Sequence, residues 1–458
     1  MKKFVNPSDK NDVRLLITTD HGTWIVITKD DLKQILTYDL SDEFYNILEE
    51  KGVILTENNV NQILQYYSSK YSFLFHGATL HIVLPTLRCN SKCIYCHSSA
   101  KECAEKEYDM DIETAKKTLE FIFQTPAQKF TIEFQGGEAL LNFELFKYIV
   151  EEGKRMAKAK NKIVNFVLVS NLINMNNKFL DFITKEKVDL CTSLDGPKEV
   201  HDKNRLLENG GGTYDIVVDN IKKVGRAKCD LGVLMVTTRH SLNCWKEIID
   251  EYVKNGQHQI QLKYINKLGF AKDKWDEQAY SIEEFIDFWK KSVNYMIELS
   301  KKGIKIYERF VKLILEKIFT DVDPSFLDFR NPCGIVSGQM AYNYNGDIYS
   351  CDEGRNFDIF KLGNVKENKY SDVFERLESQ QLISSSIIEK LLCDNCAYKP
   401  WCGTCPVMNY AEEGNIIPKL SCNSRHLLFE MMFDFVFNKL IFDDDASKIL
   451  QDWHNRQY

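Results

Sequence analysis

Three cysteines stand close together in the first quarter of the chain, at Cys89, Cys93 and Cys96. Three residues separate the first pair and two residues separate the second pair. Thiolates at this spacing in one loop can bind three irons of a cubic [4Fe–4S] cluster and leave the fourth iron open. A three-cysteine zinc site is the competing interpretation of the same residues.

The open iron gives this cysteine pattern its chemical use. It can chelate the amino and carboxylate groups of S-adenosylmethionine, and an electron from the cluster then cleaves the sulfonium to give a 5′-deoxyadenosyl radical. Such a radical abstracts hydrogen from an unactivated carbon, which no amino-acid side chain does by itself. The spacing therefore predicts radical chemistry in addition to metal binding.

A second set of cysteines lies in the last third of the chain. Its members are Cys333, Cys351, Cys393, Cys396, Cys402, Cys405 and Cys422. Seven thiolates can serve two further [4Fe–4S] clusters. A zinc ribbon is the alternative for the four central cysteines, from Cys393 to Cys405, but it leaves the other three without a purpose.

Four of the 14 cysteines stand alone in the sequence, namely Cys103, Cys191, Cys229 and Cys244. Disulfides are not expected in a reducing compartment. An isolated cysteine that binds no metal behaves as a small apolar residue. We therefore expect these four to be buried structural thiols.

The stretch from residue 79 to residue 269 alternates between short apolar segments and helical patterns, which is typical of a parallel sheet with helices packed against it. Strands are predicted at 80–85, 131–135, 164–170, 189–194, 231–237 and 259–265, each buried on both faces. Helices are predicted at 111–124, 143–159, 175–187, 213–228 and 242–255. Six strand–helix units predict an α/β fold with a partial (β/α)6 TIM-like barrel, whose catalytic groups lie at the C-terminal strand ends.

The rest of the chain divides around this barrel. We expect an N-terminal unit at 1–76, the barrel at 77–269, a helical bridging region at 270–330, a loop-rich region with seven cysteines at 331–425, and a closing helix or helix pair at 426–458.

The N-terminal unit has a pattern of its own. Strands at 14–18 and 23–27 form a predicted hairpin, and helices are predicted near 30–37, 41–50 and 57–69. This order resembles the small winged-helix domain that recognises leader peptides. The resemblance implies that a leader adds a strand to the hairpin edge near 14–27. A cap on the main domain is the alternative.

Composition excludes several classes of partner. The formal net charge is −7, so nucleic acid is not an expected partner. No apolar run reaches the length of a membrane span, and the N-terminus lacks the apolar core of a secretory signal. We therefore expect a cytoplasmic protein without a membrane partner.

Further motifs follow the first cysteine loop at the ends of predicted strands. They are Gly136-Gly137-Glu138, Ser170-Asn171, Ser193 and Arg205. With Tyr95 before the third cysteine, this order resembles the radical S-adenosylmethionine (radical SAM) superfamily. The resemblance implies that Glu138 receives the methionine amino group, that Ser170, Asn171 and Ser193 contact the ribose, that Arg205 binds the carboxylate, and that Tyr95 packs near the adenine. Ala139 stands where the family usually has proline.

The second cysteine set is similar to the SPASM extension of peptide-modifying superfamily members. That resemblance implies an inner auxiliary cluster on Cys333, Cys351 and Cys405, and an outer one on Cys393, Cys396, Cys402 and Cys422. Only two residues separate Cys402 from Cys405, where the family usually has three. Sulfatase-maturing relatives also supply a cysteine a few residues after the first, and residues 334–339 contain none. The inner cluster is therefore expected to have an open iron that can bind a substrate thiolate.

Asp352 directly follows Cys351. In sulfatase-maturing relatives an aspartate at this place accepts a proton from the substrate. The resemblance implies that Asp352 lies between the inner cluster and the radical site as a general base. A surface aspartate in a loop is the alternative.

The stretch from Leu80 to Cys422 as a whole resembles SPASM peptide maturases, closest to the His-Xaa-Ser system type and similar to thioether-forming ranthipeptide maturases. The carrying residues are Thr79–Val83, Thr86–Asn90, Phe134–Glu138 and Thr192–Pro197. The resemblance implies three [4Fe–4S] clusters, S-adenosylmethionine, a precursor peptide whose leader binds residues 1–76, and an electron donor such as flavodoxin or ferredoxin.

The predicted reaction is an intrapeptide thioether crosslink between a cysteine sulfur and the carbon of an acceptor residue. A carbon–carbon or other side-chain crosslink is one alternative, and formylglycine formation of the sulfatase-maturing type is another. A non-catalytic cluster protein, such as a redox sensor, is the alternative from a different class. The Gly-Gly-Glu motif and Arg205 argue against it, because sensing needs no clamp for a cofactor carboxylate.

Overall fold

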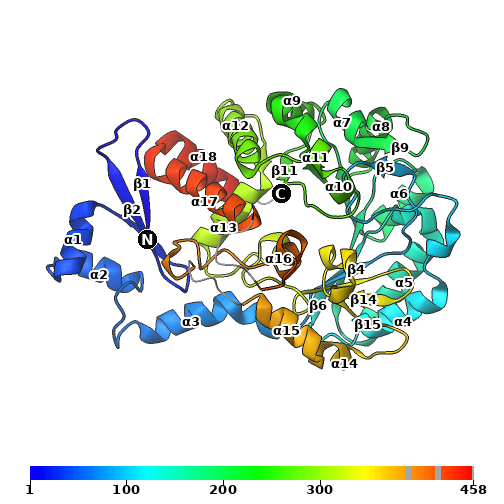
Figure 1. The fold of residues 1–458 in the computed structure, drawn as a ribbon, viewed down its shortest axis with the longest axis horizontal. Helices are drawn as coiled ribbons and strands as arrows, with labels where there is room; N and C mark the ends of the chain where they lie inside the picture. The colour runs from blue at the N-terminus through cyan, green and yellow to red at the C-terminus, as the bar shows by residue number, and fades with distance from the viewer. Residues whose placement is uncertain (388–392, 418–423, 456–458) are drawn as a thin grey trace.

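The computed structural model describes residues 1–387, 393–417 and 424–455. Its centre is one sheet of ten strands in the order β12-β11-β10-β8-β7-β6-β4-β13-β14-β15 (Figure 1). The strands are β4 (Leu80–Val83), β6 (Lys129–Phe134), β7 (Ile163–Val169), β8 (Asp189–Ser193), β10 (Leu231–Val236), β11 (Gln259–Lys263), β12 (Tyr307–Glu308), β13 (Gln339–Tyr342), β14 (Asp347–Tyr349) and β15 (Lys361–Asn364). Neighbours from β12 to β13 run parallel, and β14 and β15 continue the sheet antiparallel.

All six predicted strands are present, but their two faces differ. In β6, Phe130, Ile132 and Phe134 are buried, whereas Thr131 and Glu133 between them are half-buried. The same alternation continues through β7, β8 and much of β10. The prediction of strands buried on both faces therefore holds for β4 and β11 but is wrong for β6, β7, β8 and β10, whose second face is the partly open interior of the barrel.

Strand register identifies the polar residues of this interior face. Glu133 pairs with Val167, and Val169, two residues further along β7, pairs with Cys191. Ser193 lies two residues beyond Cys191 and shares its face. The interior of this barrel therefore carries polar side chains, as a catalytic cavity requires.

Helices cover the outer face of the sheet. The five predicted ones are α4 (Ile112–Ile122), α5 (Phe143–Ala159), α6 (Asn177–Lys185), α8 (Tyr214–Arg226) and α9 (Trp245–Lys254), with the short α7 (Lys198–Asn204) before α8. Each is amphipathic, and α4 and α6 begin at side-chain caps, Asp111 and Asn176. Phe134 of β6 packs edge-on against Phe146 of α5, with ring centroids 4.7 Å apart.

The chain after the barrel is helical as expected. It forms α10 (Phe270–Asp273), α11 (Trp275–Gln278), α12 (Ile282–Lys301) and α13 (Arg309–Phe319), and later α14 (Tyr370–Glu375), α15 (Leu377–Ser385) and α16 (Pro406–Glu413). The closing pair, α17 (Ser424–Phe442) and α18 (Asp444–Asn455), packs against α12 and α13 (Figure 1).

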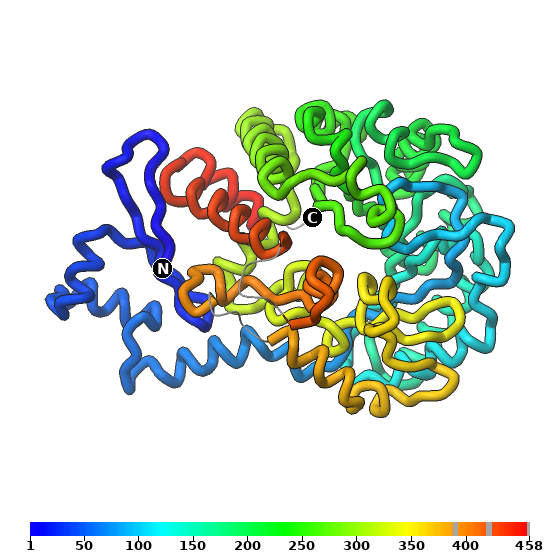
Figure 2. The backbone as a smooth tube through the Cα atoms, in the orientation of Figure 1, coloured from blue at the N-terminus to red at the C-terminus, as the bar shows by residue number. Residues whose placement is uncertain are grey.

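The N-terminal unit lies at one end of the molecule, with the barrel at the other (Figure 2). It consists of β1 (Lys2–Val5), β2 (Val13–Thr18) and β3 (Trp24–Ile27), then α1 (Lys29–Thr37), α2 (Asp42–Glu50) and α3 (Val60–Tyr71). The sheet order is β1-β2-β3, so β2 is covered on both edges. The strand β1 was not predicted, because two of its four residues are lysines.

Aromatic and polar contacts fix this unit to α13 and to the closing helix α17. The Trp24 indole N–H donates to the carbonyl of Ile318 at 2.7 Å, and Phe4 packs against Phe437 with ring centroids 6.2 Å apart. Lys2 forms an ion pair with Glu430 at 2.8 Å. The observed architecture confirms the predicted fold class, while the segment boundaries stay predictions. No helix in the described ranges is both long and apolar enough to cross a membrane.

Candidate active site

The first cysteine loop follows β4 and is held by backbone pairing on one side. The short strands β5 (Ser91–Cys93) and β9 (Arg205–Leu207) run antiparallel, and Cys93 lies opposite Arg205. The Cys89 N–H donates to the carbonyl of Lys101 at 2.9 Å. The Asn171 side-chain amide lies 3.6 Å from the Cys89 sulfur. The loop is therefore shaped before any metal binds.

The thiols of this loop fit an iron–sulfur group. Burial raises the pKa of Cys89 and of Cys96, so these thiols are neutral until a cation stabilises their thiolate forms. Three sulfurs from one loop match three corners of a [4Fe–4S] cluster. Among the described residues, no three His, Cys, Asp or Glu side chains gather closely enough to hold a single metal ion.

The Gly-Gly-Glu motif packs directly on the cysteine loop. A Cβ at Gly137 would lie 2.1 Å from the Arg88 carbonyl oxygen, and Gly136 has φ of +119°. The Glu138 N–H donates to the same Arg88 carbonyl at 2.7 Å. Only glycine permits this approach, and it brings Glu138 beside the loop.

The Glu138 carboxylate is 1% exposed and is held by three donors. It accepts hydrogen bonds from the Ser170 hydroxyl at 3.0 Å, the Asn171 N–H at 2.8 Å and the Leu140 N–H at 3.1 Å. Burial raises its pKa. A carboxylate has about four acceptor positions, so one remains for an amino group. In this structure the Ser170 hydroxyl donates to Glu138, whereas a contact with the ribose was expected for it.

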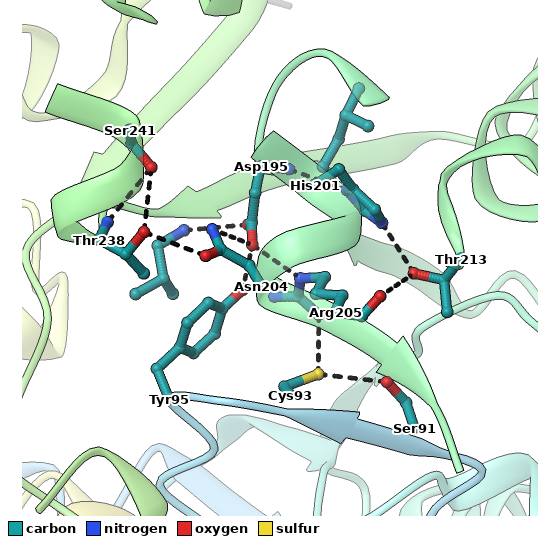
Figure 3. Close-up of polar contacts among 12 residues, drawn as sticks. Ser91, Cys93, Tyr95, Asp195, His201, Asn204, Arg205, Thr213, Thr238 and Ser241 are labelled. Atoms are coloured by element: carbon teal, nitrogen blue, oxygen red, sulfur yellow. Dashed lines mark hydrogen bonds and ion pairs between the residues drawn. The ribbon is translucent and has the colours of Figure 1, made fainter. Parts of the chain in front are cut away.

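Asp195 lies at the centre of a second group of contacts beside the first cysteine loop (Figure 3). Its side chain is fully buried and accepts hydrogen bonds from the Tyr95 hydroxyl at 2.5 Å and from Arg205 Nε at 3.2 Å. The Arg205 guanidinium lies 5.2 Å from the centre of the Tyr95 ring and 3.8 Å from the Cys93 sulfur. Two predicted cofactor residues, Tyr95 and Arg205, thus share one buried carboxylate, and Arg205 also approaches the predicted iron ligand Cys93.

His201 fixes the turn that carries Asp195 and Arg205 (Figure 3). Its Nδ1 accepts from the Asp195 N–H at 3.2 Å. Its Nε2 donates to the Thr213 hydroxyl at 3.0 Å, and that hydroxyl donates to the Arg205 carbonyl at 2.8 Å. Desolvation lowers the pKa of His201 to about 4, so the ring is neutral near pH 7. The motif contained Asp195 and His201, but nothing in the sequence assigned them these roles.

Asp352 links the second cysteine set to the first loop. Its Oδ2 accepts from His97 Nε2 at 2.9 Å, and its Oδ1 accepts from Arg355 at 2.6 Å. His97 directly follows Cys96, and Asp352 directly follows Cys351. Burial opposes ionisation, but the Arg355 and His97 charges outweigh it and hold the pKa of Asp352 well below its usual range. Asp352 therefore connects the two cysteine loops through its ion pair with His97. Neither His97 nor Arg355 was identified from the sequence.

Three cysteines of the second set meet at one cavity. Cys333, Cys351 and Cys405 line it together with Arg330 and Arg425. The Cys333 thiol donates to the Cys405 sulfur, which raises the pKa of Cys333 and lowers that of Cys405 to about 7. These are the cysteines expected to hold the inner cluster, and a cavity lined by three sulfurs fits such a group.

The outer cysteine set is described in part. Cys393 and Cys396 lie in one turn, in which the Cys396 N–H donates to the Cys393 carbonyl at 2.9 Å. Cys402 ends a second turn, with its N–H 2.9 Å from the Tyr398 carbonyl. Cys422 lies outside the described residues. The outer ligand set stays a prediction.

The remaining predicted residues have simpler surroundings. Ser193 ends β8 on the interior face and is half-buried. The four isolated cysteines are half-buried, not buried as expected: Cys103, Cys191, Cys229 and Cys244. Cys191 differs from the other three because it faces the barrel interior with Glu133, and desolvation raises its pKa to about 11.

Comparison with known proteins shows which domains this chain contains. Residues 83–257 match the Radical SAM superfamily, and residues 333–406 match the iron–sulfur cluster-binding domain SPASM. The chain is a radical SAM enzyme with a SPASM domain. These domains imply iron–sulfur clusters and S-adenosylmethionine as cofactors of this radical SAM enzyme, while the number of clusters stays a prediction.

Relatives of the radical SAM enzyme span most of the chain. A cysteine-type anaerobic sulfatase-maturating enzyme of Clostridium novyi is 26% identical over 69% of this chain and 83% of its own length. The solved structure of anSMEcpe with bound AdoMet has a TM-score of 0.68 at 21% identity, covering 81% of this chain and all of that one. Streptococcus suis SuiB bound to precursor peptide SuiA has a TM-score of 0.57 at 14% identity, covering 90% of this chain and all of that one. At these identities the two structures show the fold alone.

Proposed function

We propose that this enzyme is a maturase of a ribosomally made precursor peptide and that it forms a thioether between a cysteine sulfur and an acceptor carbon, as in the His-Xaa-Ser and ranthipeptide types. In this proposal it carries three [4Fe–4S] clusters. For each C–S bond formed, the C–H hydrogen atom goes to the 5′-deoxyadenosyl radical, the S–H proton goes to solvent, and the one remaining electron would pass to the iron–sulfur clusters. The observation that carries the proposal is the cavity lined by Cys333, Cys351 and Cys405.

The cavity supports sulfur chemistry through its ligand count. Three cysteines among the described residues line it, and residues 334–339 offer no fourth. A cube held by three thiolates keeps one iron for another ligand. A substrate thiolate is a suitable ligand for that position.

The length of the relatives supports a peptide substrate with a leader. The whole anSMEcpe chain is matched by 81% of this chain, which leaves about a fifth without a counterpart. The SuiB chain that was solved with its precursor peptide SuiA is matched by 90% of this chain. The additional coverage is 9% of this chain, about 41 residues, which corresponds to roughly half the length of residues 1–76.

The chain's own residues hold and orient the cofactor in this proposal. Cys89, Cys93 and Cys96 would bind the first cluster, Glu138 the methionine amino group, and Arg205 the carboxylate. When bound, S-adenosylmethionine and the reduced cluster supply the radical that abstracts hydrogen. The Arg205 guanidinium is 12% exposed and is fixed by Asp195, so it is positioned before the ligand arrives.

Asp352 favours crosslinking over the formylglycine alternative. Both oxygens of Asp352 already accept hydrogen bonds, Oδ2 from His97 and Oδ1 from Arg355, whereas a general base needs a free oxygen to receive a substrate proton. In the proposed reaction Asp352 keeps the two cysteine loops in register.

The N-terminal sheet has two open edges for a leader, and we place the leader on β3. The hairpin edge predicted near 14–27 comprises β2 and β3; β2 is covered by β1 and β3, so β3 is the part of it with an open side. The same unit also exposes apolar side chains on helix α3, at Leu64 and Tyr67, 59% and 48% exposed. Strand addition at β3 satisfies the backbone of an extended peptide.

The test uses the reconstituted enzyme with S-adenosylmethionine, reductant and the short cysteine-containing peptides encoded beside its gene. The product should lose two hydrogens per crosslink, and the crosslinked cysteine should resist alkylation. A control reaction lacking S-adenosylmethionine should leave mass and alkylation unchanged.

Alkylation separates the alternatives. Loss of two hydrogens with fully alkylated cysteines indicates a carbon–carbon crosslink. An aldehyde trapped by hydrazide at a former cysteine or serine indicates formylglycine. Either result contradicts the thioether proposal, and an unchanged peptide mass contradicts the peptide-maturase proposal as a whole.

A further inference from the structure

Arg330 is a buried cation whose hydrogen bonds are incomplete. The residue is 4% exposed, and its Nε and Nη2 atoms have no partner among the described residues. Desolvation lowers its pKa to about 10. A buried charged donor without an acceptor destabilises a fold strongly. The arrangement therefore indicates an acceptor that the described protein atoms do not provide.

Arg330 lies at the inner cysteine site. It lines the same cavity as Cys333, Cys351 and Cys405, and it precedes Cys333 by three residues. Two glycines make room for it, because a Cβ at Gly338 would lie 2.0 Å from Arg330 Nη1. The cavity also contains Arg425, whose Nη1 lies 3.8 Å from the Cys405 sulfur. Two guanidinium groups thus face a site built from thiols.

The N-terminal unit holds Arg330 from the other side. Its guanidinium carbon lies 3.9 Å from the centre of the Phe73 ring, and Phe73 belongs to the turn Ser72–Phe75 that follows α3. A stack of this kind fixes the plane of the guanidinium without using its N–H groups. The N–H groups remain available to an acceptor in the cavity.

We propose that Arg330 is a positioning residue for the inner auxiliary cluster, donating Nε–H and Nη2–H hydrogen bonds to its sulfur atoms while Phe73 fixes the guanidinium plane. This inference rests on the proposed function, because it takes the inner cavity as a cluster site. Hydrogen bonds to cluster sulfur stabilise the more negative, reduced state and raise the reduction potential. Arg330 thereby makes the inner cluster easier to reduce.

The test compares Arg330→Lys and Arg330→Met with the parent chain, all in a Cys89/Cys93/Cys96→Ala background that leaves the auxiliary clusters. The reduced fraction of the inner cluster is followed by paramagnetic resonance at a fixed reductant potential. We expect it to fall by about tenfold or more in Arg330→Met, because both charge-assisted hydrogen bonds to the cluster are lost. The outer cluster should not change. The matched control is Arg376→Lys, whose Nη1 donates to the Leu362 carbonyl away from the cavity.

A second measurement separates this role from simple packing. In cluster-free protein, Arg330→Met should raise the urea midpoint, because it removes an unpaired buried charge. In reconstituted protein the same change should lower the midpoint. If Arg330 served only to stack on Phe73, both midpoints would fall, and that result would overturn the inference.

Two further results test the role of Arg330. If Arg330→Met does not fold, Phe73→Leu should lower the reduced fraction in the same direction by a smaller factor. Unchanged reduction of the inner cluster in both variants, with full iron content, contradicts the role of Arg330. Neither measurement needs a peptide, so a failure of the proposed peptide chemistry would be seen separately, as an active cluster protein that leaves peptides unmodified.

Discussion

A single buried carboxylate, Asp195, accepts hydrogen bonds from residues of several elements. Tyr95 comes from the first cysteine loop, Arg205 from β9, and the backbone N–H of Val236 from β10, at 3.3 Å. Residues that orient a ligand-binding group commonly matter almost as much as the group itself. The geometry of the predicted cofactor site therefore depends on single residues such as Asp195.

Asp195→Asn should weaken S-adenosylmethionine binding about tenfold, because the amide holds the Arg205 guanidinium less firmly than the carboxylate does. Equilibrium binding to the reconstituted enzyme measures this. Asp250→Asn is the control, since Asp250 only accepts a hydrogen bond from the exposed Tyr295 hydroxyl at 2.7 Å. Equal affinity in parent and Asp195→Asn would show that Arg205 is not the carboxylate ligand.

His201 should make stability depend on pH. Its pKa is lowered from 6.5 to about 4 on folding, so below pH 6.5 the unfolded state binds more protons and stability falls until about pH 4. The loss between pH 7 and pH 5 is about 2 kcal/mol. Urea unfolding of cluster-free protein at the two pH values measures it. In His201→Gln this loss should be smaller by that amount, and an unchanged loss contradicts the neutral buried ring.

Asp352 and His97 should behave as one unit. We expect Asp352→Asn and His97→Gln each to lower product formation, and the double variant to lose little more than either single one, because both changes break the same tie between cysteine loops. Turnover of the three variants measures the coupling. A strong loss in Asp352→Asn with nearly full activity in His97→Gln would instead restore Asp352 as the general base.

Among the elements, the strands and helices of the barrel were the most predictable part. Apolar segments such as Val164–Val169 and helical patterns such as that of α5 are local signals, and they were placed within a few residues. The interior face was not predicted, because a half-buried Glu133 between apolar residues looks the same as one on an outer surface. The polar network of His97, Asp352 and Arg355 joins residues more than 250 positions apart, and no local pattern contains that information.

The N-terminal sheet gives an edge-specific prediction. The Thr19 N–H donates to the Thr23 carbonyl, and antiparallel pairs alternate, so the Val26 N–H points away from β2. Val26→Pro should therefore remove an outward donor without disturbing the β2–β3 pairing. We expect about tenfold weaker binding of the precursor peptide, measured by fluorescence anisotropy of a labelled leader.

The matched control lies on the opposite edge. The same alternation, set by the Asn6 N–H that donates to Asp12, points the Lys3 N–H away from β2 on the β1 side. Lys3→Pro should leave leader binding unchanged. The reverse outcome, weak binding in Lys3→Pro and normal binding in Val26→Pro, would move the leader to β1.

At the scale of the whole molecule, the two cysteine regions share one sheet. Strand β13 of the SPASM segment pairs parallel with β4, the strand that leads into the first cysteine loop. This pairing, with the Asp352–His97 tie, fixes the two sites relative to each other. The cysteine spacings predicted both sites separately, whereas their joining depends on long-range packing that the spacings do not encode.

We propose that this radical SAM enzyme carries three clusters. The most direct test reconstitutes the protein without oxygen, counts iron and measures 5′-deoxyadenosine release, beside a Cys89/Cys93/Cys96→Ala variant. We expect about twelve irons per chain with deoxyadenosine released, and about eight irons with none released in the variant. Bound zinc in place of iron, or no deoxyadenosine from the intact protein, would contradict the account.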